Sequence, residues 1–461
     1  MGNYKSTNPS TGQLLAEYPV ISDETAAEIV QRSETAFRSW RHVPVQDRAA
    51  VLTKVADLYA ERVDDLALII TQEMGKPISE ACKEVKLVSA IFRYYAQEGP
   101  GFLEDDVLEP RSGDAAVVRS TPVGPLLGIM PWNYPYYQVA RFAAPNLLLG
   151  NTIILKHARN CPQAALAIEE IFHEAGLPQD AYINVFASTE QVAGFVADPR
   201  VQGVSLTGSE KAGSIIAELA GRHLKKYVLE LGGADPFLVL DNHNLERTVR
   251  SAVVGRLGNG GQACTAAKRF IVLEDVYEEF VDAFTNAMAQ ALPGDPTDPG
   301  TVFGPLSSEA AVEELLEQVQ DAVSKGATLR TGGKRPSGAG AFLEATVLTD
   351  VTPEMRAHQE ELFGPVAVVH RAASVDEAIE MANDSPFGLG GAVFTEDEEL
   401  GRAVADRLDT GMVTINGTSQ SQPDLPFGGV KRSGVGRELG RYGLDEFVNK
   451  KLVRIPQTSR S

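Results

Sequence analysis

Short apolar runs alternate with helical segments along most of this chain, and that alternation limits the possible folds more than any other feature. The runs stand at Thr152–Leu155, Tyr182–Phe186, Val201–Leu206, Tyr227–Leu231 and Phe237–Leu240. Strands that alternate with helices form βαβ units, which build a parallel sheet with helices on its faces. The sequence therefore predicts an α/β fold.

A second series of the same style begins near Asp235. Its runs are Arg269–Leu273, Val366–His370, Gly391–Thr395 and Gly411–Asn416. We therefore expect two open α/β domains of similar size, with Glu230 near their junction, where ligands commonly bind. Before them, residues 23–100 are helical in pattern with a break at Gly75-Lys76-Pro77, and Ala115–Ser120 and Pro122–Met130 read as strands.

The tail segment Lys450–Ile455 also reads as a strand, but no partner for it is evident nearby in the sequence. One interpretation is a plain edge strand. The one we favour is pairing with another subunit, because an exposed strand edge tends to recruit a second chain.

Composition narrows the class of protein. The chain has 461 residues, 43% of them hydrophobic, and a formal net charge of −20, which argues against a nucleic-acid surface or an anionic membrane as partner. No apolar run reaches the length of a membrane span, and the first residues lack the apolar core of a secretory signal. Cys82, Cys161 and Cys264 lie far apart, which indicates neither a disulfide nor a metal site. A cytoplasmic location is expected.

The segment Gly258–Thr265 places Cys264 at the end of a glycine-rich turn. Glycines let a substrate and the backbone N–H groups approach a thiol closely, as a nucleophile requires. In Val228–Gly233, Glu230 interrupts an apolar strand and is followed by two glycines. Together these segments suggest a thiol nucleophile with a separate carboxylate base, although either alone could be structural.

The usual Gly-x-Gly-x-x-Gly dinucleotide signature is absent after an early strand. Another phosphate site is available where the strand at Val201–Leu206 runs into a helix near Ser209, although by itself an ordinary helix cap is the more probable interpretation. Lys156 and Arg159 stand at the carboxyl end of a buried strand, where α/β sheets place ligands. A lone pair of this kind is usually solvated surface.

A set of motifs in this order spans nearly the whole chain and resembles the aldehyde dehydrogenase superfamily. The motifs are Pro131-Trp132-Asn133-Tyr134-Pro135, Leu206-Thr207-Gly208-Ser209, Leu229-Glu230-Leu231-Gly232-Gly233, Gly261-Gln262-Ala263-Cys264, Glu360-Glu361-Leu362-Phe363-Gly364-Pro365, Pro426-Phe427-Gly428-Gly429-Val430-Lys431 and Gly434-x-Gly436-Arg437-Glu438. Three others look most like bacterial succinate semialdehyde dehydrogenases: Leu155-Lys156-His157-Ala158, Gly233-Ala234-Asp235-Pro236-Phe237 and Ala266-Ala267-Lys268-Arg269-Phe270.

The resemblance implies an aldehyde dehydrogenase-like fold, with two open α/β domains of parallel-rich sheets and a small β oligomerisation element. Residues 1–110 and 133–230 would form the dinucleotide-binding domain, and residues 231–432 the catalytic domain that carries Cys264. Residues 111–132 and 446–461 would supply the oligomerisation strands. The implied assembly is a homodimer or a homotetramer.

The resemblance also implies catalytic roles. Cys264 would add to the aldehyde carbon, and the Asn133 amide and the Cys264 N–H would hold the oxyanion. Hydride transfer would leave a thioester, which water activated by Glu230 would hydrolyse. Glu438 resembles a second carboxylate that relays protons.

For the cofactor, the resemblance implies Trp132, Lys156, Ser209, Glu361 and Phe363 as binding residues. Members that prefer NAD commonly carry a glutamate three residues after the lysine, and here that residue is Arg159. An arginine cannot accept the ribose hydrogen bonds but can pair with a 2′-phosphate. We therefore expect NADP as the preferred cofactor, with NAD also possible, unless Arg159 is turned into solvent.

Arg141 lies eight residues after Asn133, about two helical turns along the same face. It could reach the entrance of the tunnel to Cys264, or form an interhelical salt bridge instead. The resemblance favours a clamp for a substrate carboxylate, helped by Ser421. Asp424 departs from the family pattern, which commonly has a basic residue there, and so weakens this assignment.

The leading hypothesis is NAD(P)-dependent oxidation of the small-molecule aldehyde succinate semialdehyde to succinate. The alternatives are another ω-carboxylated or aliphatic aldehyde and a non-catalytic structural relative, which should have lost Cys264, Glu230 or Asn133. Acyl transfer to coenzyme A would favour a replaced Glu230, and a cysteine hydrolase would need a histidine partner that the sequence does not identify.

Overall fold

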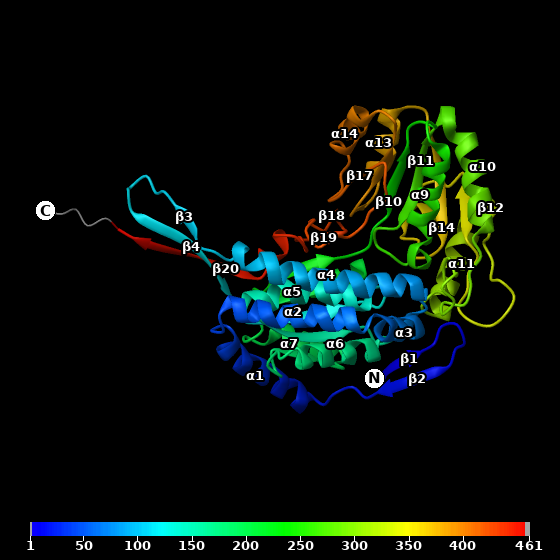
Figure 1. Cartoon of the computed structure of the whole chain (residues 1–461). Coiled ribbons are helices and arrows are strands. Elements are labelled where there is room, and N and C mark those ends of the chain that lie inside the picture. Colours follow the sequence, from blue (N-terminus) through cyan, green and yellow to red (C-terminus); the bar gives the residue numbers. More distant parts are fainter. Residues whose placement is uncertain (1, 457–461) are drawn as a thin grey trace.

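The computed structural model describes residues 2–456 and consists of two α/β lobes and a projecting β arm (Figure 1). The α/β class expected from the sequence is confirmed. Part of the expected oligomerisation segment 446–461, from residue 457 on, lies outside the described residues. No helix in the described range is both long and apolar enough to cross a membrane.

The first lobe is built on a six-stranded sheet in the order β19-β9-β8-β5-β6-β7. Its strands β5 to β9 are parallel, and the short β19 adds to the edge antiparallel to β9. Their bounds are β5 (Pro125–Met130), β6 (Thr152–His157), β7 (Tyr182–Asn184), β8 (Gly203–Thr207), β9 (Lys226–Glu230) and β19 (Gly434–Val435). The central strands are buried on both faces, as parallel sheets between helices are.

Eight helices and a hairpin complete this lobe. The helices are α1 (Asp23–Trp40), α2 (Val45–Glu61), α3 (Val63–Met74), α4 (Ile78–Phe102), α5 (Pro135–Leu149), α6 (Pro162–Glu174), α7 (Thr189–Ala197) and α8 (Glu210–Arg222), and the hairpin is β1 (Tyr4–Thr7) with β2 (Leu14–Tyr18). The predicted break at Gly75-Lys76-Pro77 separates α3 from α4, and Gly75 adopts the left-handed φ of 81° that ends α3.

The second lobe contains a seven-stranded sheet in the order β12-β13-β14-β11-β10-β16-β17. The strands are β10 (Asp235–Val239), β11 (Ala267–Leu273), β12 (Thr328–Thr331), β13 (Thr346–Thr349), β14 (Val366–Ala372), β16 (Ala392–Phe394) and β17 (Thr414–Ile415). The helices are α9 (Leu245–Leu257), α10 (Glu274–Gln290), α11 (Glu309–Ser324), α12 (Arg356–Gln359), α13 (Val375–Asn383) and α14 (Glu398–Ala405). The short strands β15 (Phe387–Gly388) and β18 (Val430–Lys431) pair with each other, and the 3₁₀ turn η1 (Gly258–Gly261) follows α9. A second 3₁₀ turn, η2 (Tyr442–Leu444), packs against α5 of the first lobe.

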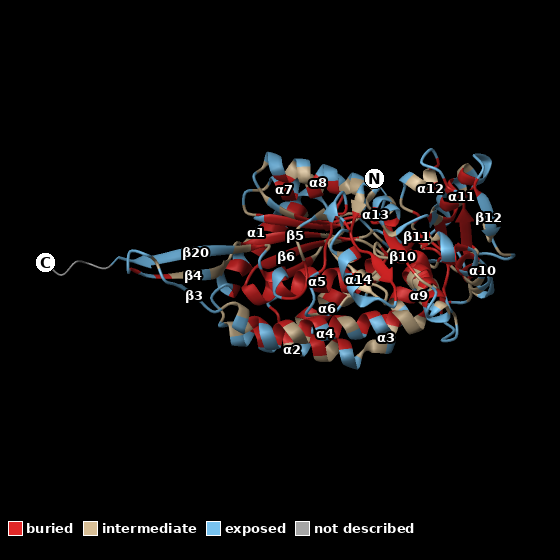
Figure 2. Cartoon of the chain, turned by 90° about the horizontal axis from the view of Figure 1, so that it is seen from above, coloured by how far each residue is buried: buried red, intermediate tan, exposed pale blue. Residues whose placement is uncertain are grey.

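The arm is a three-stranded antiparallel sheet of β3 (Asp106–Leu108), β4 (Ala115–Pro122) and β20 (Val448–Ile455), and its surface is largely exposed (Figure 2). The tail is an edge strand: β20 pairs with β4 of its own chain along its whole length, and its other edge has no partner strand among the described residues. Pairing of that edge with another subunit stays a prediction. A pairing partner more than three hundred residues away in the sequence is invisible to local patterns.

One expected domain boundary also needs correction. Residues 111–132 were expected to supply oligomerisation strands, but only β4 of that range lies in the arm. β5 runs through the first lobe's sheet between β8 and β6. The turn at Val123–Gly124 separates them, held by the Asn151 side chain, which accepts from both backbone N–H groups.

Candidate active site

Cys264 follows a tight turn at the end of α9, in the second lobe. Asn259, Gly260 and Gly261 all have left-handed backbone conformations, with φ of 52°, 64° and 75°. A Cβ on Gly261 would lie 2.3 Å from the carbonyl oxygen of Gly364, so only glycine fits there. The glycines predicted to open space around the thiol thus also shape the turn itself.

The structure brings Asn133 to this turn from the other lobe. Its side-chain Nδ2 donates to the Gln262 carbonyl at 3.1 Å, and Asn259 Nδ2 donates to the Asn133 carbonyl at 2.9 Å. An amide nitrogen carries two hydrogens, so one remains for another acceptor. Asn133 and Cys264 both line the same cavity, as an oxyanion donor and a nucleophile must.

The thiol sits in an environment that keeps it protonated at rest. Burial raises the pKa of Cys264 to about 12, while the positive charges of Arg141 and Lys268 oppose that rise and the carboxylates of Glu361 and Glu230 add to it. A thiolate therefore forms only when a base or a change in these charges assists it.

Glu230 stands at the end of β9, where two glycines follow it. It is 2% exposed, and neither carboxylate oxygen has a hydrogen-bond partner among the described residues. Burial raises its pKa well above the usual value, Arg141 opposes the rise, and Glu438 adds to it. The protonation state of such a buried, unpartnered carboxyl depends on the charges around it, which makes the group suited to proton transfer.

Glu438 and Arg141 form a buried ion pair beside Glu230. Arg141 Nε lies 2.5 Å from Glu438 Oε2, and Ser205 Oγ donates to Glu438 Oε1 at 3.4 Å. Burial alone would lower the pKa of Arg141, but Glu438, Tyr137, Glu230 and Cys264 together outweigh burial and raise that pKa above its ordinary value. Burial raises the pKa of Glu438, and Arg141 opposes this.

The position of Arg141 differs from the expected one at a tunnel entrance. The residue lies on α5 as predicted, but its side chain is fully buried. Its guanidinium packs against the Phe427 and Tyr137 rings at 4.4 and 5.0 Å from their centroids. It also donates to Thr207 Oγ1 at 3.3 Å. Arg141 forms a salt bridge, but not between helices, because its partner Glu438 lies in the irregular segment after β19. Asn133 precedes α5, so the two residues do not share a helix face.

Ser421 connects to this pair through one side chain. Tyr137 Oη donates to Ser421 Oγ at 2.7 Å and accepts from Arg141 Nη1 at 3.4 Å. Neither Arg141 nor Ser421 lines the cavity that Asn133 and Cys264 share or a smaller cavity lined by Ala263 and Thr265. The structure therefore joins the two expected carboxylate ligands into one chain of hydrogen bonds.

A cavity of about 720 Å³ opens on one side of Cys264 and collects most of the expected cofactor residues. Trp132, Ser209, Glu361 and Phe363 line it together with Cys264. The Trp132 and Phe363 rings meet edge to face at 5.7 Å. Ser209 caps α8 through its side chain, which accepts from the Ala212 N–H, so the ordinary cap coexists with a helix N-terminus that faces the cavity.

These features fit a dinucleotide. The N-terminus of α8 offers free N–H groups for a pyrophosphate, and the two aromatic rings offer a flat apolar wall. Glu361 Oε2 faces Gly232, where a Cβ would lie 2.6 Å from the carboxylate, so the glycine leaves room for that side chain at the cavity wall.

Lys156 and Arg159 lie outside this lining, at the carboxyl end of β6. Lys156 Nζ is 5.8 Å from the centroid of the Tyr4 ring, and the exposed Arg159 donates to the Gly2 carbonyl at 3.2 Å. Burial lowers the pKa of Lys156 to about 8, and the like charge of Arg159 lowers it further. Two neighbouring cations suit an added anionic group.

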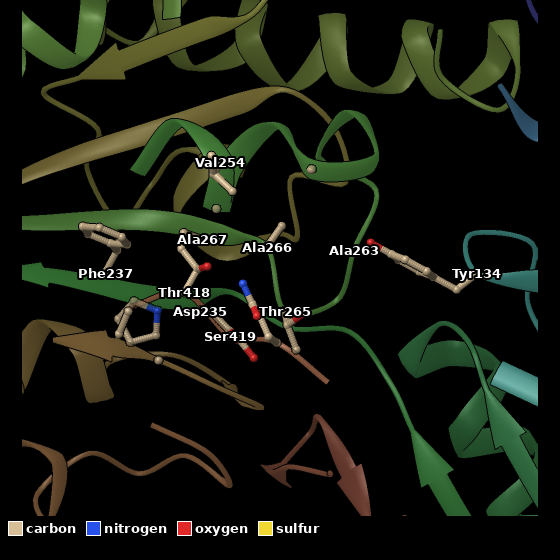
Figure 3. Close-up of a pocket in the computed structure, with 16 residues that line it drawn as sticks. Tyr134, Asp235, Phe237, Val254, Ala263, Thr265, Ala266, Ala267, Thr418 and Ser419 are labelled. Atoms are coloured by element: carbon tan, nitrogen blue, oxygen red, sulfur yellow. The ribbon is translucent and has the colours of Figure 1, made fainter. Parts of the chain in front are cut away.

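A smaller cavity has a volume of about 160 Å³ (Figure 3). It is lined by Ala263 and Thr265, the chain neighbours of Cys264, and by Tyr134 and the segment 418–420. Asp235 also contributes to it, and its Oδ2 has no hydrogen-bond partner among the described residues.

The sequence did not reveal the buried ion pair Lys76–Glu84, which fixes the backbone just after Asn133. Glu84 on α4 accepts from the backbone N–H groups of Tyr136 and Tyr137 at 2.9 and 3.1 Å, and it pairs with Lys76. Glu80, one turn earlier, accepts from the Asn259 N–H at 2.6 Å. The spacing of Glu80 and Glu84 on a helix face that also carries buried apolar residues was the available signal.

Within residues 2–456, no group of three or more histidine, cysteine or acidic side chains is placed to hold a metal ion. Cys161 is buried at the start of α6 and Cys82 is half-buried on α4.

Comparison with known proteins adds to this geometry. The family model described as the aldehyde dehydrogenase family matches residues 2–453. A succinate-semialdehyde dehydrogenase [NADP(+)] of Deinococcus radiodurans is 55% identical over 451 residues, which cover 98% of this chain and 94% of that protein. A Mycobacterium ulcerans protein of the same description is 44% identical over 97% of this chain and 98% of its own.

Solved structures agree in fold. Succinic semialdehyde dehydrogenase from Streptococcus pyogenes, in complex with NADP⁺, superposes with a TM-score of 0.97 at 41% identity and covers 98% of this chain and 100% of that one. Betaine aldehyde dehydrogenase from Staphylococcus aureus, in complex with NAD⁺, gives a TM-score of 0.95 at 29% identity, with 100% and 92% covered.

Proposed function

The chain belongs to the aldehyde dehydrogenase family, and from that premise we propose that it oxidises succinate semialdehyde to succinate, with NADP as the preferred cofactor. One observation carries the proposal: the partly exposed Cys264 stands in the wall of a dinucleotide-sized cavity, beside the Asn133 amide. The Deinococcus and Mycobacterium relatives, which carry that substrate and cofactor in their names, support it.

In the first half of the reaction, Cys264 adds to the aldehyde carbon and forms a thiohemiacetal. The free hydrogen of the Asn133 amide and the Cys264 N–H hold the negative oxygen, and losing one such donor typically costs about 3 kcal/mol. Arg141 and Lys268 favour the thiolate that this step needs. A bound dinucleotide would supply the acceptor for the hydride of the thiohemiacetal carbon, so that Cys264 would then carry a thioester.

In the second half, Glu230 activates the water that hydrolyses the thioester. Its unpartnered carboxyl can take a proton once it is ionised, and the Arg141 charge favours that ionised form. Glu438 lies between Arg141 and Ser205 and serves as the next group for the proton. Retention of Glu230 supports hydrolysis over acyl transfer to coenzyme A.

For the cofactor, Trp132, Ser209, Glu361 and Phe363 bind the nicotinamide and pyrophosphate portions in the large cavity. Lys156 would hold the adenosine ribose, and Arg159 would exchange the Gly2 carbonyl for a 2′-phosphate, which its planar fork can bind with two hydrogen bonds. NAD would lack that contact, so it is the weaker of the two cofactors.

For the substrate, the chain from Arg141 through Tyr137 to Ser421 is the proposed reader of the distal carboxylate. Arg141 supplies the positive charge, and the hydroxyls of Tyr137 and Ser421 supply hydrogen bonds nearer the surface. Since Arg141 is already paired with Glu438, we expect the hydroxyls to make the direct contacts.

One observation favours a second candidate, an aldehyde dehydrogenase for an uncharged aliphatic aldehyde. Asp235 is the one charged residue in the lining of the smaller cavity, and its carboxylate would repel an acidic substrate. Burial raises the pKa of Asp235 to about 6, which reduces this repulsion only below that pH.

The test compares kcat/KM for succinate semialdehyde, glutarate semialdehyde and butanal. We expect the first to be used best, and a Ser421→Ala variant to lose more with the two acids than with butanal. A wild-type preference for butanal over both acids would establish the second candidate instead. Cys264→Ala should abolish oxidation with each aldehyde and leave NADP binding nearly intact, and turnover by that variant would end the proposed mechanism.

Cofactor choice has its own test. Arg159→Ala should raise the KM for NADP by about tenfold and leave the KM for NAD unchanged, because only the 2′-phosphate contact is lost. The matched control is Arg38→Ala, an exposed arginine on α1. Equal effects on both cofactors would contradict the 2′-phosphate assignment.

We further propose a division of labour among the parts. Residues 1–110 and 125–230 form the dinucleotide-binding domain, residues 231–432 the catalytic domain, and the arm assembles a homodimer or homotetramer. The arm exposes Val107, Leu452 and Ile455 at 73%, 60% and 67%, and it leaves strand edges open at β3 and β20. Light scattering of Leu452→Glu against wild type tests the assembly.

The proposed reaction needs Cys264 as a free thiol. A reducing compartment maintains it in that state, so we propose the cytoplasm as the location.

A further inference from the structure

Lys268 is a buried cation that the mechanism above uses only as a charge. We propose that Lys268 is a positioning residue that ties the turn of the nucleophile to the carboxylate of Glu361, so that one ammonium group orders both the thiol and a cofactor-binding side chain. The inference rests on the proposed roles of Cys264 and of the large cavity, and it goes beyond them by adding the residue that connects the two.

The first part of the connection is to the nucleophile. Lys268 is the second residue of β11, and its side chain is 2% exposed. Its Nζ donates to the carbonyl oxygens of Ala263, Cys264 and Ala266 at 3.1, 3.0 and 3.3 Å. Three carbonyls of one short segment thus converge on a single ammonium group, which holds the Cys264 backbone in place.

The second part is to the cofactor cavity. Lys268 Nζ lies 3.2 Å from Glu361 Oε1, and that same oxygen accepts from the Gly233 N–H at 3.1 Å. Glu361 lines the large cavity and is partly exposed there. One carboxylate oxygen is therefore anchored in the protein, and the other is left beside Gly232 at the cavity wall.

The carbonyl contacts alone would not require a lysine. Burial lowers the pKa of Lys268, so keeping its charge costs free energy that the Glu361 carboxylate offsets. The carboxylates of Glu361 and, to a smaller extent, Asp235 favour the charged lysine, and Glu361, the one in direct contact, lines the large cavity. Lys268 therefore contacts both the backbone of Cys264 and a side chain that lines the cofactor cavity.

The charges around both groups set the expected signs. Lys268 faces Glu361, Arg256, Asp235 and Cys264. Cys264 in turn faces Arg141, Lys268, Glu361 and Glu230. Removing the Lys268 charge leaves the Glu361 carboxylate unbalanced near the thiol, which disfavours the thiolate. Removing the Glu361 charge has the opposite effect, because Lys268 then acts on the thiol without an opposing anion.

The experiment compares Lys268→Met, Lys268→Arg and Glu361→Gln in the full chain, without any aldehyde. One readout is the dissociation constant for NADP, followed by quenching of Trp132, with Trp40→Phe as background in all variants. The other is the rate of Cys264 alkylation by iodoacetamide from pH 6 to 10 without cofactor, measured by mass spectrometry of the Cys264 peptide. Because the thiol pKa of about 12 lies above this range, the displacement of the rising log rate along the pH axis measures the change of the alkylation midpoint.

We expect Lys268→Met to weaken NADP binding about tenfold. It should also move the alkylation midpoint up by about one pH unit. Glu361→Gln should weaken binding by a similar factor but move the midpoint down. Lys268→Arg should restore most of the alkylation profile, since it keeps the charge. A general structural defect would shift the midpoint in one direction for both charge-removing variants.

An unchanged dissociation constant and an unchanged alkylation profile in folded Lys268→Met would overturn the inference, and so would shifts of the same sign in Lys268→Met and Glu361→Gln. If Lys268→Met does not fold, the Glu361→Gln midpoint decides, and a midpoint that stays in place or rises counts against the proposal. Neither readout uses an aldehyde, so an error in the proposed substrate leaves this test unaffected.

Discussion

Among the described residues, two buried ion pairs of the first lobe can be compared. Lys76–Glu84 joins the start of α4 to the N-terminus of α5, and Arg141–Glu438 joins the middle of α5 to the chain that returns from the second lobe. Both carboxylates are almost fully buried. Their surroundings differ, and so does what each pair does.

Glu84 has a full set of partners. One oxygen accepts from the Tyr136 and Tyr137 N–H groups and the other pairs with Lys76, whose ammonium also lies 3.6 Å from the centroid of the Tyr134 ring. With no acceptor left over, the pair fixes backbone just after Asn133. This is the arrangement expected of a structural pair.

Glu438 is less completely satisfied. Besides Arg141, it has the Ser205 hydroxyl at 3.4 Å, and the unpartnered Glu230 adds its field to the same site. Incomplete pairing near a cavity leaves protonation free to change, which catalysis requires. The number of hydrogen bonds to the carboxylate, and not its burial, therefore distinguishes the structural pair Lys76–Glu84 from the reactive pair Arg141–Glu438.

The largest expected effect comes from removing the unpartnered carboxyl. Glu230→Gln should lower kcat by about 10²- to 10⁴-fold, because hydrolysis of the thioester loses its base. The first turnover should stay fast, so stopped-flow absorbance should show a burst of one NADPH per site. Glu218→Gln, an exposed residue of α8, is the control. Loss of the burst as well would place Glu230 in the first half of the reaction.

The next effect tests the saturated pair. Lys76→Met should lower the free energy of unfolding of the first lobe by about 3 to 5 kcal/mol, since Glu84 would remain buried without its cation. Denaturant unfolding followed by Trp40 fluorescence measures it. The double variant Lys76→Met/Glu84→Gln should recover most of the loss. Equal loss in both variants would show that packing, and not charge, explains the effect.

Breaking the unsaturated pair should act on pH dependence more than on stability. The Glu438 charge raises the pKa of Glu230, so Glu438→Gln should lower that pKa. Because hydrolysis needs ionised Glu230, the acidic limb of the kcat–pH profile should move down by about one unit. The free energy of unfolding should fall less than in Lys76→Met, because Arg141 keeps its hydrogen bonds to the hydroxyls of Tyr137 and Thr207. An upward shift would contradict this assignment.

The smallest effect concerns the neighbouring cations Lys156 and Arg159. Lys156 is charged below its pKa of about 8 and neutral above it. NADP should therefore bind about fivefold more weakly at pH 9 than at pH 7, whereas NAD should change little. Isothermal titration calorimetry of wild type and Lys156→Gln measures this. A parallel loss for both cofactors would remove Lys156 from the 2′-phosphate site.

Much of the fold was predictable because parallel strands buried on both faces are short apolar runs. The runs at Thr152–Leu155 and Tyr227–Leu231 correspond to β6 and β9 within a few residues. The pairing of β20 with β4 was not predictable, since a strand's pattern does not name its partner. For the same reason the place of β5 inside the first sheet was missed.

The site divides in the same way. The glycine-rich turn before Cys264 and the carboxylate of Glu230 were recognisable in the sequence. A run of glycines, or a carboxylate within an apolar strand, lowers the stability of the fold and therefore indicates a chemical role. The partner of Arg141 was not, since spacing along a helix places a residue on a face and says nothing of what the face meets. Lys76, Glu84 and Lys268 escaped notice because a lysine or glutamate on a helix or strand normally reaches water.

The sequence by itself determined the α/β class, the thiol and its carboxylate, and the family to which the motifs belong. Those conclusions depend on local patterns and on residue types whose chemistry is intrinsic. Only the tertiary structure decided which charges are paired and which are not, because pairing is made between segments as distant as residues 141 and 438. Burial then sets how strongly each pair acts, since water no longer screens it.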